Sequence, residues 1–345
     1  MKKKILPLML WILIPGLVFC FLNSMADRQD NWLKIVDRYA TKQEIDAFFI
    51  GSSRVLAAID PDAFIEEIQT ETGKCPRVLK VSQGFTTLAE YYCFIRQIAV
   101  RWPGILKQCT VFIEAPMGFP SAATWNSAWV APEFYFYIVP YLSFDVIQWM
   151  WHTKLPVSQK VLLTRMWFIK NIPIFAYQSG VRTEMLQGGT FWVLGILKKF
   201  AGDNATKAFP WTFDYEKKIA IKYAANDLKM QRPVGSWDRT VLADLVRLIR
   251  QHGGQTVFYR MPLSSVQTVI YETPVRRKDR EHFCEWARIW GTPVLDNGIQ
   301  VTDQDFPDSW HLSRSRAAEF SKDVARKFIQ TDYFRNTYLE PFKGK

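Results

Sequence analysis

The chain has 345 residues, of which 48% are hydrophobic and 22% are charged, and this composition excludes a disordered or fibrous protein. The net charge is +11, but the lysines and arginines are spread along the chain without a long basic block, which argues against a nucleic-acid-binding protein. The five cysteines and the histidines are widely separated, so we expect neither a disulfide framework, nor a metal site, nor another cofactor.

The first 26 residues predict a membrane anchor. "MKKK" precedes eighteen uncharged residues, from Ile5 to Leu22, which are enough to span the core of a bilayer. The lysines should stay in the cytoplasm, so the rest of the chain should lie outside it, in the periplasm. A cleaved signal peptide is the alternative, because "SMA" at 24–26 resembles a cleavage site, although the apolar stretch is longer than a usual signal core.

Residues 27–45 are predicted to be a juxtamembrane linker, and 46–345 a single domain in which apolar strands alternate with amphipathic helices. The predicted strands are 46–50, 77–82, 109–116, 255–262 and 292–298, and the predicted helices are 61–72, 87–102, 236–251, 277–290 and 313–329. This alternation is typical of an α/β fold, a three-layer sandwich whose parallel sheet is covered by helices on both faces. Ligands of such sheets bind at the carboxyl ends of the strands.

A different kind of sequence occupies about 117–235, between the third and fourth strands. Seven of the 14 tryptophans lie between Trp125 and Trp211, and no strand–helix alternation is visible there. We expect an aromatic-rich, partly helical insertion at the ligand-binding edge of the sheet. It either buries its own aromatic side chains in a core, or presents a surface that lies on the membrane, docks a membrane partner or stacks against sugar rings.

Two serines follow the first strand in "FFIGSSR", and near the C-terminus "DFPDSWHLS" carries an aspartate and a histidine three residues apart. Nucleophilic serine catalysis needs a base beside the hydroxyl and a carboxylate that orients this base. The predicted set is therefore Ser53 as nucleophile, His311 as base and Asp308 as orienting acid. Ser52 is the alternative nucleophile, but the third position of the G-x-S turn favours Ser53.

Three charged residues at the same edge are further candidates for the site. Arg54 either clamps an anionic substrate or anchors the turn to a carboxylate, and the structural role is favoured. Glu114 lies near the end of the third predicted strand and Arg260 near the end of the fourth, so we expect both of them near the substrate.

The G-x-S turn after the first strand and the D-x-x-H pattern before the last helix resemble the SGNH/GDSL hydrolase superfamily. The resemblance is closer to its membrane-anchored branch, which includes the D-alanine transfer protein of teichoic acid synthesis and the alginate O-acetylation proteins, and in which "GSS" replaces "GDS". It covers the sheet core and both ends of the chain, but not 117–235. It implies a flavodoxin-like sheet, the roles given above to Ser53, His311 and Asp308, and an oxyanion-hole amide from Gly84. The asparagine of the family's third block has no match in "EAPMGF" (114–119), and Asn126 is the next candidate.

The resemblance implies an extracytoplasmic O-acyltransferase or esterase that acts on a cell-envelope or secreted polysaccharide through an acyl-serine intermediate. It also implies a membrane-bound O-acyltransferase as partner. The alternative is a non-catalytic subunit with the same fold, which binds or scaffolds a polysaccharide assembly complex.

Overall fold

The structure is a computed structural model, and it describes 31–40, 45–82, 88–115, 143–152, 157–171, 217–218, 220–221 and 236–335. The chain divides into two compact units, one formed by Met1–Lys34 and Ser127–Pro210, and the other by Ile35–Asn126 and Trp211–Lys345. The predicted anchor lies outside the described residues, as does most of the predicted insertion. Among the residues that are described, no helix combines the length and apolar character needed to cross a membrane.

The second unit contains a five-stranded, all-parallel sheet with strand order β2-β1-β3-β4-β5. In this sheet Phe49 lies opposite Lys80 on one side and Phe112 on the other. The prediction of an α/β fold with a parallel sheet is confirmed. The strands are β1 (Ala47–Gly51), β2 (Val78–Ser82), β3 (Thr110–Glu114), β4 (Gln255–Tyr259) and β5 (Val294–Leu295).

The last strand is shorter than predicted, because β5 covers two of the seven residues in 292–298. Pro293 precedes it and lacks the N–H that a longer ladder would need, although its carbonyl still accepts a hydrogen bond from the Phe258 N–H at 2.9 Å.

Helices of the sheet unit precede, separate and follow the strands along the chain. They are α2 (Asn31–Ala40, which begins in the other unit), α3 (Ser53–Ala58), α4 (Pro61–Thr72), α5 (Leu88–Arg101), α13 (Ser236–Gln251), α14 (Ser265–Tyr271), α15 (Pro274–Ile289), η3 (Asp303–Asp305), α16 (Arg314–Ile329) and α17 (Asp332–Phe334). The sequence analysis did not predict α3 and α14, and it assigned the residues of α2 to a linker. The indole N–H of Trp102 donates a hydrogen bond to Asp37 in α2 at 3.2 Å, which ties this helix to the sheet unit.

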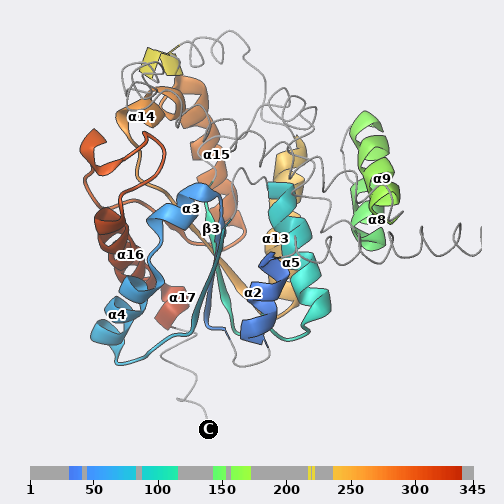
Figure 1. Cartoon of the computed structure of the whole chain (residues 1–345), viewed down its shortest axis with the longest axis horizontal. Helices are drawn as coiled ribbons and strands as arrows, with labels where there is room; N and C mark the ends of the chain where they lie inside the picture. The colour runs from blue at the N-terminus through green and yellow to red at the C-terminus, as the bar shows by residue number, and fades with distance from the viewer. Residues whose placement is uncertain are drawn as a thin grey trace, which may run out of the picture. The chain divides into compact units, whose positions relative to one another are not determined.

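Helices cover both faces of the sheet (Figure 1). Successive side chains of a strand point to opposite faces, so Phe48 and Phe49 enter different cores. Phe49 stacks on Phe112 with ring centroids 4.4 Å apart, and Phe112 meets Phe328 of α16 edge-on. On the other face Phe48 contacts Phe94 of α5. All of these strand side chains are fully buried, so the strands form a well-packed support for the residues at the edges of the sheet.

Both ends of α4 are capped by residue types that favour these positions. The Asp60 side chain accepts hydrogen bonds from the N–H groups of Asp62 and Ala63, Pro61 is the first helical residue, and Gly73 ends the helix with a φ of 71°. These caps satisfy backbone groups that a helix end leaves open.

Gly51 ends β1 where the chain turns into α3, and the turn leaves no room for a side chain. A Cβ at this position would lie 2.0 Å from Cγ2 and 2.8 Å from Cβ of Val55. We predict that Gly51→Ala lowers the free energy of unfolding by about 1–3 kcal/mol, the usual cost of overpacking a core. Chemical denaturation measures this change. Val55→Ala in the same chain removes the contact with Cγ2 but keeps Cβ, so it should recover only part of the extra cost, whereas purely additive effects would contradict the clash.

Candidate active site

Ser53 lies at the carboxyl edge of the sheet because β1 ends at Gly51 and the chain turns directly into α3. Ser52 is the N-cap of this helix, and its side chain accepts a hydrogen bond from the Arg54 N–H at 3.2 Å. Ser53 is the first helical residue. The local cap chemistry therefore fixes the backbone on which the Ser53 hydroxyl is mounted.

Ser53, His311 and Asp308 form a continuous hydrogen-bonded chain of side chains. The Ser53 hydroxyl lies 2.9 Å from Nε2 of His311, and Nδ1 of His311 lies 2.7 Å from Oδ2 of Asp308. An ionised carboxylate can accept hydrogen bonds but cannot donate them. We therefore assign the ring proton of His311 to Nδ1, which leaves Nε2 to accept the proton of the serine. This arrangement can deprotonate a hydroxyl as it attacks an electrophile.

Asp308 is fixed by its own turn as well as by the imidazole. Its Oδ1 accepts hydrogen bonds from the backbone N–H groups of His311, at 2.8 Å, and Trp310, at 3.3 Å. Partial burial on its own raises the pKa of Asp308, but the hydrogen bonds and the charge of His311 outweigh it and hold the pKa below its usual range. The carboxylate is therefore ionised at neutral pH and can stabilise a protonated imidazole.

The loop that carries these two residues is held by the start of α14. Between them, Ser309 is buried with a left-handed φ of 59°, a conformation that non-glycine residues rarely adopt. Its carbonyl accepts a hydrogen bond from the buried Ser264 hydroxyl at 2.6 Å, and the Trp310 carbonyl accepts one from the Gln267 side chain at 3.2 Å. Ser264 and Gln267 also form the capping box of α14, so one cap positions both the helix and the histidine loop.

Glu114 and Arg54 hold the turn between β1 and α3 in place. The Glu114 carboxylate accepts a hydrogen bond from the Ser52 hydroxyl at 2.7 Å and forms an ion pair with Arg54 at 3.2 Å. Arg54 also donates to the Pro262 carbonyl at 3.2 Å. Both side chains of the pair are only 11% exposed. These contacts agree with the structural role that the sequence favoured for Arg54, and they engage Ser52 with Glu114 rather than with His311.

Tyr259, at the end of β4, lies next to this ion pair. The side chain is fully buried, and among the described residues its hydroxyl has no hydrogen-bond partner. Burial, followed by the nearby charge of Glu114, raises the pKa of Tyr259 well above its usual value. The phenol is therefore neutral at neutral pH.

Of the remaining predicted site residues, the structure describes Arg260, which has no contact with Ser53, His311 or Asp308 among the hydrogen bonds and ion pairs that it makes. Arg260 forms an ion pair with Asp296 at 2.7 Å and donates to the Cys284 sulfur at 2.8 Å, so its contacts lie at the outer β4–β5 side of the edge. Gly84 and Asn126 lie outside the described residues, and their predicted roles in an oxyanion hole stay predictions.

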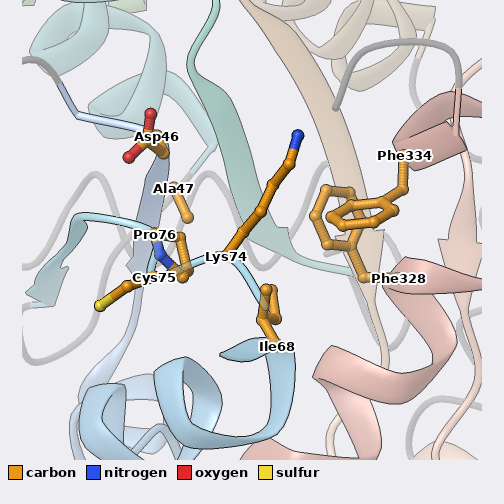
Figure 2. A pocket seen from close by; sticks show the side chains of 8 residues that line it. All are labelled: Asp46, Ala47, Ile68, Lys74, Cys75, Pro76, Phe328 and Phe334. Carbon is orange, nitrogen blue, oxygen red and sulfur yellow. The ribbon is translucent and has the colours of Figure 1, made fainter. Parts of the chain in front are cut away.

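The structure also has a cavity of about 220 Å³ at the opposite, amino-terminal edge of the sheet. Figure 2 shows that it lies beneath the start of β1 at Asp46, between Ile68 of α4 and the paired rings of Phe328 and Phe334. Because ligands of parallel sheets bind at the carboxyl ends of strands, this cavity is not part of the candidate active site. In the part of the chain that the structure describes, no group of three histidine, cysteine or acidic residues could hold a metal ion.

Two residues that position the histidine loop, Ser264 and Gln267, were not predicted, although one local pattern was visible. S-x-x-Q at Ser264–Gln267 is a capping-box signature and marks the start of α14. Its contact with the histidine loop spans more than forty residues, as does the contact between Ser52 and Glu114. No local pattern signals such pairings.

The lowered pKa of Asp308 predicts a pH-dependent contribution to stability. Because the folded pKa is below the unfolded value of about 3.9, the ionised carboxylate stabilises the fold above that pH, and the contribution is lost as the pH falls through the folded pKa. The side chain is 56% exposed, so screening limits the effect to less than about 1 kcal/mol. We expect Asp308→Asn to lower the melting temperature at pH 7 and to have less effect near pH 3.

Asp332→Asn is the matched control, because Asp332 is 93% exposed and its contact with Arg335 is 3.9 Å long. Its effect should be negligible at both pH values. Equal effects of Asp308→Asn at both values would show that Asp308 stabilises the fold through shape and not through charge.

Comparison of the sequence with protein-family models and with curated proteins finds no match in either set.

Proposed function

We propose that the protein is an SGNH-like serine acyltransferase or esterase, anchored in the bacterial cytoplasmic membrane, that modifies a cell-envelope or secreted polysaccharide outside the cytoplasm. The observation that carries this proposal is the contact between the Ser53 hydroxyl and Nε2 of His311 at 2.9 Å, with Asp308 on the other ring nitrogen. Strand order 2-1-3-4-5 adds support, because it is the flavodoxin-like order and its strand order reverses beside β1, where such sheets bind ligands.

The proposed reaction has two steps. In the first, Ser53 Oγ attacks the carbonyl carbon of an acyl donor while His311 Nε2 takes the serine proton. The bond to the donor then breaks, His311 returns the proton to the leaving group, and the acyl group remains on Ser53. In the second, a sugar hydroxyl or water attacks the acyl carbon and loses its proton to His311. The bond between this carbon and Ser53 Oγ then breaks, and His311 returns the proton to Oγ, which regenerates Ser53.

Stabilisation of the negative oxygen in each step requires hydrogen-bond donors. The resemblance to SGNH proteins assigns two of these donors to the backbone N–H groups of Ser53 and Gly84. A third donor is not identified, since no asparagine follows β3 in "EAPMGF".

Support for a polysaccharide substrate and a membrane setting comes from the sequence. An apolar stretch from Ile5 to Leu22 follows three lysines, and "GSS" is the motif of the membrane-anchored branch that acylates envelope polymers. In this setting a membrane-bound O-acyltransferase would supply the acyl groups.

An activated ester tests the chemistry directly. We expect the full-length protein to release p-nitrophenolate from p-nitrophenyl acetate in a burst of one equivalent per active site. Mass spectrometry should then find the acetyl group on Ser53. If the protein is a transferase, turnover after the burst should be slow in water and faster with an acceptor glycan. Absence of any acyl adduct on Ser53 would contradict the proposal.

The second candidate function is a non-catalytic scaffold or binding subunit of a polysaccharide assembly complex. The missing third oxyanion-hole residue favours it, because loss of one donor alone slows acyl transfer by about a hundredfold or more. The two candidates differ in cells: a scaffold supports normal polymer acylation after Ser53→Ala, whereas an enzyme does not.

A further inference from the structure

Exposed apolar side chains are concentrated in two helices outside the sheet unit, α8 (Phe144–His152) and α9 (Val157–Asn171). Among the described residues, eleven large apolar side chains are exposed, and five of them lie in these two helices: Phe144, Trp151, Val157, Val161 and Phe168. Figure 1 shows α8 and α9 side by side, in green. We call this pair the aromatic hairpin.

The exposed side chains form one stripe on each helix. In α9, Val157, Val161, Arg165 and Phe168 are all exposed, and their spacing of three or four residues places them on one face. In α8, Phe144 and Trp151 are seven residues apart and share a face in the same way. The opposite sides of the two helices are buried, at Val146, Ile147, Met150 and Leu163.

Contacts between the helices join the two stripes into a single surface. Phe144 contacts Trp167, which contacts Phe168, with ring centroids 5.7 Å and 4.9 Å apart. At the other end the indole N–H of Trp151 donates to the Thr164 hydroxyl at 2.9 Å. The aromatic rings are therefore held in place and do not collapse into the space between the helices.

The charges around this surface are mainly positive. Among the residues of α8 and α9 whose side chains the structure describes, Asp145 is the one acidic residue, and Lys160 and Arg165 are basic. The Lys160 ammonium lies 5.9 Å from the centre of the Trp151 ring, and Arg165 is exposed within the α9 stripe. A face of aromatic and branched apolar side chains with basic residues beside them is typical of helices that lie in the headgroup region of an anionic bilayer.

We propose that the aromatic hairpin rests on the surface of the bilayer that holds the N-terminal anchor, with Phe144, Trp151 and Phe168 inserted among the lipid headgroups. The occupant of this face is anionic phospholipid. The unit that contains the hairpin also contains residues 1–34, which include the predicted anchor. Fifteen residues of α9 are too few to span a bilayer, so the hairpin lies in the interface and does not cross it.

The inference depends on the proposed membrane location and not on the chemistry of Ser53. Membrane contact through a second element, in addition to the anchor, would restrict how far the catalytic unit can move from the bilayer, because residues on both sides of the hairpin continue into that unit.

Site-specific photocrosslinking in the full-length protein tests the proposal. p-Benzoylphenylalanine is placed at Phe168, and separately at Phe144, in chains reconstituted into vesicles of phosphatidylglycerol and phosphatidylethanolamine. Ile289 of α15 is the matched control, because at 66% exposed it equals Phe144 at 65% but lies in the sheet unit. We expect phospholipid adducts at 144 and 168 in several-fold greater yield than at 289.

Three results would overturn the proposal. Equal lipid adducts at all three positions would show that the hairpin has no preference for lipid. Crosslinks at 144 and 168 to a second copy of the chain would make the face a dimer contact. In native membranes, crosslinks at these positions to another protein, such as an O-acyltransferase, in place of lipid would make it a docking site for that protein.

The charge component has its own test. Arg165→Gln, in the chain with the crosslinker at Phe168, should lower the yield of lipid adducts in vesicles with phosphatidylglycerol, by up to about fivefold for the one charge removed. In vesicles of phosphatidylcholine alone it should have no effect. Loss of adducts in both kinds of vesicle would contradict an electrostatic role, and no loss in either would assign the binding to the apolar face alone.

Ester-burst activity is measured in parallel, because a failed lipid result with a normal burst overturns the membrane contact and leaves the catalytic proposal unaffected.

Discussion

Ser53→Ala should abolish acyl transfer to the polymer and eliminate the burst from p-nitrophenyl acetate. The reason is that the Ser53 hydroxyl is the group that lies 2.9 Å from the base. Loss of a serine nucleophile typically slows such reactions by about 10⁴-fold or more. The burst amplitude and the acyl content of the polymer in cells both measure the effect.

The triad should also act as one unit. His311→Ala should cost about as much as Ser53→Ala, and the double variant should be no slower than either, since each step needs both groups. Ser315→Ala is the control, because Ser315 is an exposed serine near the start of α16. Ser52→Ala should cost much less than Ser53→Ala, since the Ser52 hydroxyl binds Glu114. A Ser53→Ala chain that supports normal polymer acylation would overturn the enzymatic proposal and leave the scaffold.

Glu114→Gln should lower the free energy of unfolding by about 3 kcal/mol or more, the usual cost of breaking a buried ion pair. The substitution keeps the volume and removes the charge, so it leaves the Arg54 guanidinium in a site that is 11% exposed without its carboxylate. Chemical denaturation measures the stability. The same variant should slow the burst while Ser53 and His311 remain intact, because Glu114 holds the Ser52 side chain next to the nucleophile.

Two controls separate charge from packing. Glu66→Gln removes the carboxylate from a pair with Lys322 in which Glu66 is 65% exposed, and should cost less than about 1 kcal/mol. Arg54→Met combined with Glu114→Gln removes both charges and should be more stable than Glu114→Gln alone. Additive losses in the double variant would show that the ion pair is not the source of the effect.

Local patterns in the sequence were sufficient to predict the parallel sheet and to select Ser53, Asp308 and His311 as a candidate group, whose catalytic role stays a prediction. The predicted apolar strands 46–50 and 109–116 correspond to β1 and β3, and the predicted helix 61–72 corresponds to α4. Ser53, Asp308 and His311 were found because nucleophilic catalysis requires a specific set of residue types, and two of them are three residues apart. A turn motif and a short loop motif carry this information without knowledge of the fold.

The supports of the site could not be predicted in this way. Glu114 meets Ser52 across 62 residues, and Ser264 meets Ser309 across 45. Such contacts depend on strand order and on the path of the loop, which hydrophobic periodicity does not encode. Arg260 illustrates the same limit: its position after β4 placed it at this edge, its ion pair with Asp296 after β5 could not be read from the sequence, and its role near the substrate stays a prediction. A strand end specifies an edge of the sheet and not a place along that edge.

The 258 residues between Ser53 and His311 have a consequence for the order in which the protein becomes active during synthesis. The segment Ile35–Asn126, which contains β1 and both of its neighbouring strands, is made first, whereas the histidine loop comes near the end of Trp211–Lys345. A nascent chain therefore carries the serine without its base for most of its elongation. Any chain that ends before this loop also lacks α16, which packs against α4. Closing such a long loop costs entropy and requires both ends of the chain. If Ser53 is the nucleophile as proposed, reactivity would appear only after the sheet unit has been translated and folded, and truncated products would have an unreactive serine.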